Sequence, residues 1–101
     1  MDIYIKNFST ALGGRFKKEG NFSGEEFREK YLEPLFNGKK TDQINIYLDG
    51  TEGYPSSFLE EAFGGLVRLL NDKEIVKKRL RLVTSDSMLE KEILNYIENA
   101  L

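Results

Sequence analysis

The sequence predicts an α/β fold with a mostly parallel sheet of about four strands, one antiparallel pairing at the N-terminal edge, and three main helices. Two patterns carry this prediction. Short segments in which apolar and polar residues alternate indicate strands, and longer segments with apolar residues at every third or fourth position indicate helices. These segments follow one another as strand, strand, helix, strand, helix, strand, helix. That order favours parallel strands joined by right-handed crossovers.

The segment 43–70 is the centre of the predicted fold and contains a strand, a loop and a long helix. Ile44, Ile46 and Leu48 occupy every second position, which is the period of a strand. Asp49-Gly50 then ends the strand, because Gly accepts backbone angles that other residues resist. Polar residues therefore follow directly after a strand, where open α/β proteins usually bind their ligands.

The central helix is expected to begin at Ser56–Ser57 and to carry a broad apolar stripe as far as Leu70. Ser57 and Glu60 fit the capping box S-x-x-E. The pair Gly64–Gly65 lies inside this helix, where each Gly costs about 1 kcal/mol relative to Ala. We therefore expect another backbone to approach the helix there, either from within the molecule or from another protein.

The N-terminal part of the chain is expected to form two strands and a helix. Residues 2–8 alternate as a strand, and 15–18 are predicted to pair with it antiparallel after the turn at 13–14. A helix begins at Ser23, which forms a second capping box with Glu26. Pro34 predicts a kink or an early end of that helix, because Pro lacks a backbone N–H.

After the helix end at Asn37–Gly38, residues 39–42 are expected to link to the central strand. Downstream, residues 73–78 predict a short helical turn, 80–83 a strand, and 85–87 the cap of a final helix. The sheet is expected to end in an exposed edge.

Composition narrows the classes of function. A chain of 101 residues is predicted to form one domain, 1–101. It contains no Cys and no His, so thiol chemistry, the usual general base and the commonest metal ligand are missing. The net charge of −2 argues against a nucleic-acid partner. No apolar run or leader-like N-terminus is present, so we expect a cytoplasmic protein without a membrane partner.

Two blocks of sequence carry a family resemblance. The segment 49–66 (DGTEGYPSSFLEEAFGGL) resembles the signature of a bacterial STAS-like domain of unknown function. Gly13–Phe16 and Phe22–Arg28 resemble that family's second block, so the likeness covers roughly residues 11–84. The resemblance implies a fold related to the STAS domains of anti-sigma-factor antagonists.

The resemblance also implies a site. In those antagonists a Ser at the start of the corresponding helix is phosphorylated by an ATPase-like kinase, which binds the surrounding surface. Matching the motifs places Ser57, or alternatively Ser56, at that position, and a helix start accommodates phosphate well. The alternative is that both serines are only helix caps. The partner-binding residues expected by this likeness are Tyr54, Pro55, Phe58, Glu61, Gly64 and Gly65.

Two features depart from the antagonists' pattern. Pro55 stands where they carry an acid, and Phe58-Leu59 replaces their Gly-Leu. These departures weaken the case for phosphorylation more than the case for partner binding. We therefore expect binding through this loop and helix with or without modification.

Arg15 is a candidate ligand-binding residue. Glycines beside an Arg can present N–H groups and a guanidinium fork to an anion, but an internal pair with a carboxylate is the commoner role. Neither G-x-G-x-x-G nor G-x-x-x-x-G-K is present. The acidic groups lie near helix starts, where they complement the dipole, and we predict no metal and no cofactor.

We therefore predict a non-catalytic regulatory module that binds an ATPase- or kinase-like protein through residues 54–66. No His is available to activate a serine, and Tyr54–Phe58 does not fit G-x-S-x-G, so no catalytic residue is assigned. The alternative is a small-ligand or nucleotide sensor that uses Arg15 and the helix start at Ser57. A third interpretation is a homodimer formed through the sheet edge or the central helix.

Overall fold

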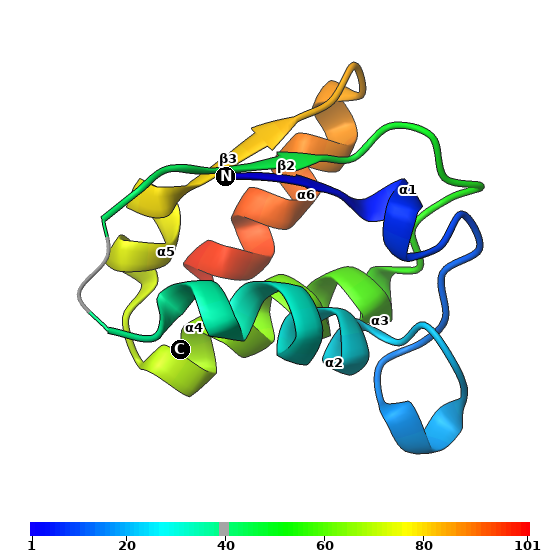
Figure 1. Cartoon of the computed structure of the whole chain (residues 1–101), viewed down its shortest axis with the longest axis horizontal. Coiled ribbons are helices and arrows are strands. Elements are labelled where there is room, and N and C mark those ends of the chain that lie inside the picture. The colour runs from blue at the N-terminus through cyan, green and yellow to red at the C-terminus, as the bar shows by residue number, and fades with distance from the viewer. Residues whose placement is uncertain (39–40) are drawn as a thin grey trace.

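The structure is a computed structural model that describes residues 1–38 and 41–101. Its three strands, β1 (Asp2–Tyr4), β2 (Ile44–Tyr47) and β3 (Leu80–Val83), form one parallel sheet in the order β1-β2-β3. The register places Ile3 beside Ile46 and Ile46 beside Leu82. The helices pack against one face of this sheet (Figure 1).

The core lies between that face and the helices. It is formed by apolar side chains that are 9% exposed or less, and both the strands and the helical segments contribute to it. The core residues are Ile3, Ile5, Phe27, Leu32, Ile44, Ile46, Leu48, Phe58, Leu59, Ala62, Phe63, Leu66, Val67, Val76, Leu80, Ile93 and Ile97. The alternation in 43–48 therefore predicted correctly which side chains of β2 are buried.

The predicted fourth, antiparallel strand is absent from the described part of the chain. Residues Lys17–Glu19 form a 3₁₀ turn, in which a Glu19 carboxylate oxygen accepts a hydrogen bond from Phe16 N–H at 2.9 Å. The preceding loop pairs with the start of the next helix, since Gly24 N–H donates to Gly14 O at 2.9 Å. Because these groups are hydrogen-bonded locally, they are not available for antiparallel pairing with β1.

The first strand is also shorter than predicted, because the chain turns into α1 (Ile5–Phe8) directly after Tyr4. This turn brings the Phe8 ring to 5.5 Å from the rings of Phe22, Phe27 and Tyr31. Packing of an aromatic cluster has therefore overridden the local alternation.

The segment after Ser23 forms α2 (Gly24–Phe27), a π turn (Arg28–Leu32) and a 3₁₀ turn (Glu33–Phe36) that contains Pro34. Ser23 is the predicted cap, since its Oγ accepts a hydrogen bond from Glu26 N–H at 3.0 Å. The Glu26 side chain in turn accepts from Phe22 N–H. Residues 39 and 40 of the predicted link lie outside the described residues.

The central helix consists of α3 (Ser56–Leu59), a π turn (Glu60–Gly64) and α4 (Gly65–Leu70), and it ends at Asn71 in the left-handed conformation. It is followed by α5 (Lys73–Arg79) and α6 (Ser87–Glu98), whose N-cap is Asp86. A Cβ on Gly24 would lie 2.3 Å from Phe58 O, so α2 and α3 touch through their backbones.

Within the molecule, side chains and not another backbone pack on Gly64–Gly65, whereas contact with another protein at these glycines stays a prediction. A Cβ on Gly65 would lie 2.3 Å from the Arg28 guanidinium, and one on Gly64 would lie 2.5 Å from the Glu60 carboxylate. Both glycines are buried. They make room for charged side chains of the same molecule.

Candidate functional site

The loops that follow β2 and β3 are held together by one carboxylate. Asp49 follows β2 and accepts hydrogen bonds from the Thr84 hydroxyl at 2.6 Å and from Ser85 N–H at 3.1 Å. These donors, the Thr84 hydroxyl foremost, lower the pKa of Asp49. The two loops therefore form one surface at the carboxyl ends of the strands, where the sequence placed the site.

Tyr54 anchors the loop after β2. Its hydroxyl donates a hydrogen bond to Leu48 O at 2.6 Å, and its ring lies 6.3 Å from the Phe58 ring. Burial raises the pKa of Tyr54 to about 12. The phenol therefore remains protonated near neutral pH and serves as a fixed donor.

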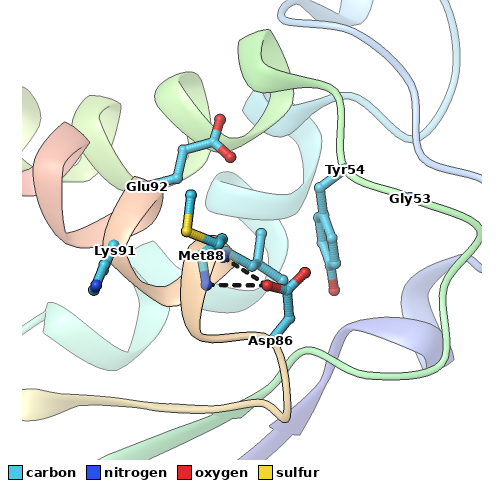
Figure 2. Close-up of a pocket in the computed structure, with 7 residues that line it drawn as sticks. Gly53, Tyr54, Asp86, Met88, Lys91 and Glu92 are labelled. Carbon is cyan, nitrogen blue, oxygen red and sulfur yellow. Dashed lines mark hydrogen bonds between the residues drawn. The ribbon is translucent and has the colours of Figure 1, made fainter.

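A depression of about 620 Å³ lies between this loop and α6, and we call it the loop–α6 groove. It is lined by Gly53, Tyr54, Asp86, Met88, Leu89, Lys91 and Glu92. Figure 2 shows Tyr54 on one side of it and Met88 with Glu92 of α6 on the other.

The groove combines an apolar wall with acidic groups. Met88 is 72% exposed, which makes it the most exposed of the large apolar side chains in the described residues. Asp86 and Glu92 add negative charge to the lining, and Lys91 adds one positive charge. An exposed apolar side chain in a concave surface is typical of a contact point for another molecule.

The two candidate serines follow the loop after β2. α3 begins at Ser56, which is exposed, whereas Ser57 is half-buried. The first backbone hydrogen bond of the helix runs from Leu59 N–H to Pro55 O. The N–H groups of residues 56–58 therefore have no backbone acceptor within the helix. These free donors favour negative charge at this point.

The predicted capping box at Ser57 was wrong. The N-cap is Pro55, which provides no side-chain hydrogen bond, and the Glu60 carboxylate binds two arginines instead of the helix start. The interpretation of Ser57 as a helix cap therefore has no support in the hydrogen bonding.

Of the six predicted partner-binding residues, Tyr54 is half-buried and Pro55 is exposed. Phe58 is fully buried, and Glu61, Gly64 and Gly65 are also buried. These four buried residues lie beneath the surface and are not exposed on it. The sequence patterns did not single out Met88, although it lies outside the apolar stripe of the final helix and so had no core role.

Arg15 belongs to an internal ion-pair cluster. Its Nη1 lies 2.6 Å from Glu60 Oε1, and Arg68 contacts the other oxygen of that carboxylate at 2.7 Å. Hydrogen bonds from Arg68 and Arg15 lower the pKa of Glu60 to about 2. Arg15 is therefore already bound to a carboxylate of the same molecule, which is the role that the sequence analysis gave as the commoner one.

Arg28 occupies the more buried part of the same cluster. It donates to Glu61 O at 2.8 Å, to the Glu61 carboxylate, and through Nε to Glu33 at 2.9 Å. Its side chain is 11% exposed. The cluster thus joins the loop before α2, the α2 segment and the central helix.

In residues 1–38 and 41–101, no group of three or more acidic side chains is arranged to hold a metal ion. Within the same ranges, no helix is both long enough and apolar enough to cross a lipid bilayer.

Comparison with protein families gives a match for residues 23–90 to the family described as STAS-like domain of unknown function (DUF4325). The chain belongs to this STAS-like family. The match spans the central strand, the loop, the central helix, β3 and the first turn of α6. It leaves the Gly13–Phe16 block outside. No curated protein and no solved structure matched the chain.

Proposed function

We propose that this STAS-like domain is a non-catalytic regulatory module that binds a protein partner, an ATPase or kinase-like protein, through the loop–α6 groove and the adjoining surface of residues 54–66. One observation supports the proposal: the half-buried Tyr54 of the loop and the exposed Met88 of α6 line the same groove, and the exposed start of α3 follows Tyr54 by two residues in the chain. A fixed aromatic and an exposed apolar side chain are the kind of pair that anchors a protein contact.

Phosphorylation at the helix start is the proposed switch, with Ser56 as the more accessible acceptor and Ser57 as the second. A phosphate would add about −1.5 to −2 charges near neutral pH. The free N–H groups of the first turn would stabilise it. The added charge would repel an acidic surface on the partner beside the helix start and so weaken its binding.

Two titratable groups of residues 54–66 are poorly suited to acid–base catalysis, which supports a non-catalytic role. Tyr54 has a pKa of about 12 and Glu60 has a pKa of about 2, so both are shifted away from neutrality. An efficient general acid or base has a pKa near the working pH.

The test is co-purification of the tagged protein from its native host, with mass spectrometry of bound proteins and of modified serines. We expect an ATPase-fold protein to be recovered together with the unmodified domain. We expect that protein to be absent from the fraction of the domain that is modified at Ser56 or Ser57. Recovery of the domain without any other protein, in both modification states, would contradict the proposal.

A further inference from the structure

β1 presents an open edge of the sheet. Its inner side pairs with β2, and Asn45 N–H donates to Met1 O at 2.8 Å. In a parallel ladder this bond directs the backbone groups of residues 1 and 3 toward β2, so those of Asp2 and Tyr4 point to the open side. Unpaired groups of this kind form a template for another strand.

Apolar side chains gather beside this edge. Met1 is 66%, Tyr4 39% and Tyr31 36% exposed. Together with Pro34 and Leu35 they line a depression of about 320 Å³ along β1. Natural edge strands are usually protected by short length, charges, Pro or a covering element; this edge is short and has Asp2 and Lys30 beside it, but it is also flanked by exposed apolar surface.

The Tyr4 ring leaves the edge itself accessible. It stacks on Tyr47 of β2, with ring centroids 4.3 Å apart and an angle of 10° between the planes. The ring is therefore held over the outer face of the sheet, and it does not cover the backbone groups at the edge.

We propose that a second copy of this chain binds this edge, with the two β1 strands antiparallel and related by a two-fold axis at Ile3. Tyr4 N–H of each copy then donates to Asp2 O of the other, and the two Ile3 residues form the non-hydrogen-bonded pair at the centre. The result is a continuous six-stranded sheet with an isologous interface.

Strand length and charge both favour a second copy as the occupant. β1 has three residues before the chain turns into α1, so only about three residues of an added strand can pair with it, and a second β1 has that length. The depression beside β1 contains one acid, Asp2, and one base, Lys30, so two copies can face each other without an excess of like charge. The acidic loop–α6 groove lacks this self-complementarity.

The pairing makes a specific prediction about charge. Because residue 4 of one copy lies opposite residue 2 of the other, Tyr4→Asp places two carboxylates opposite each other at both ends of the pair. Combining it with Asp2→Lys converts both into opposite-charge pairs. Leu94→Asp, at an exposed apolar position of α6, is the matched control.

The experiment is sedimentation velocity of the full chain at concentrations from about 10 µM to about 1 mM, since a short interface gives weak association. We expect a species with twice the 11.6 kDa monomer mass for the wild type and the control. Tyr4→Asp should remain monomeric, and the double variant should regain the dimer. Circular dichroism confirms that each variant is folded.

Two outcomes would overturn the proposal. The first is a wild type that stays monomeric throughout the concentration range. The second is a dimer that is equally stable in Tyr4→Asp, because it would place the interface elsewhere. If the wild type stays monomeric and instead binds a strand of another protein from a lysate, the proposal is also overturned.

Discussion

Glu60 shows how single contacts determine the chemistry of this surface. Its carboxylate lies between Arg68 and Arg15, which lower its pKa from 4.5 to about 2. Because the folded-state pKa is the lower one, the ionised group stabilises the fold fully above about pH 4.5. This contribution is lost as the pH falls toward about 2.

We therefore expect Glu60→Gln to lower the free energy of unfolding at pH 7 and to make it fall less steeply below about pH 4.5. Urea denaturation at a series of pH values measures both effects. Wild-type and variant curves that run parallel from pH 7 into acid would contradict this assignment.

Gly24 is the residue at which two helical segments meet. A Cβ there would lie 2.3 Å from Phe58 O, a backbone atom that cannot rotate away. We expect Gly24→Ala to destabilise the protein by about 1–3 kcal/mol through overpacking.

Gly14→Ala is the matched control for Gly24→Ala, since the nearest atom to its added Cβ is 3.9 Å away. Thermal denaturation should separate the two variants clearly. Equal midpoints would mean that α2 and α3 do not touch through their backbones.

At the scale of elements, the two Ser-x-x-Glu motifs behave differently. Ser23 caps α2 through a bond from Glu26 N–H at 3.0 Å, whereas the N-cap of α3 is Pro55. We expect Ser23→Ala to cost about 1 kcal/mol of stability and Ser57→Ala to cost much less. Chemical denaturation of both variants measures the difference, and a larger loss for Ser57→Ala would restore the capping interpretation.

The central strand and the capped helices could be predicted because their signals are local. The alternation of Ile44, Ile46 and Leu48 identified β2, and Asp86 was within the predicted cap of the final helix. The 3₁₀ turn at 17–19 and the end of β1 at Tyr4 could not be predicted in this way. They depend on side-chain bonds and on packing of Phe8 against rings distant in sequence.

The candidate site could be predicted to a similar extent. The strand-to-helix junction was located from the resemblance and the pattern of 43–70, and the family match confirms the resemblance. The part of the candidate site that lies on α6 was missed, because only the tertiary fold places Met88 and Tyr54 in one groove. Likewise, the roles of Gly64 and Gly65 depend on Arg28 and Glu60, whose side-chain positions sequence spacing does not encode.

At the scale of the whole molecule, the proposed partner-binding surface and the proposed dimer edge involve different elements. The loop–α6 groove lies at the carboxyl ends of β2 and β3, and the apolar depression lies along β1 beside Tyr31 and Leu35. The groove is lined by the loop after β2 and by α6, and the depression lies along β1, so one short sheet connects the two surfaces. A dimer through β1 would therefore carry two partner-binding grooves.

The most direct measurement is the amount of partner recovered with Met88→Asp compared with Leu94→Asp, in pull-downs from the native host. Both positions are exposed on α6, at 72% and 46%, so both variants should fold, but only Met88 lines the groove. We expect Met88→Asp to lose the partner and Leu94→Asp to retain it at the wild-type level. Equal recovery with the two variants would contradict binding through the loop–α6 groove.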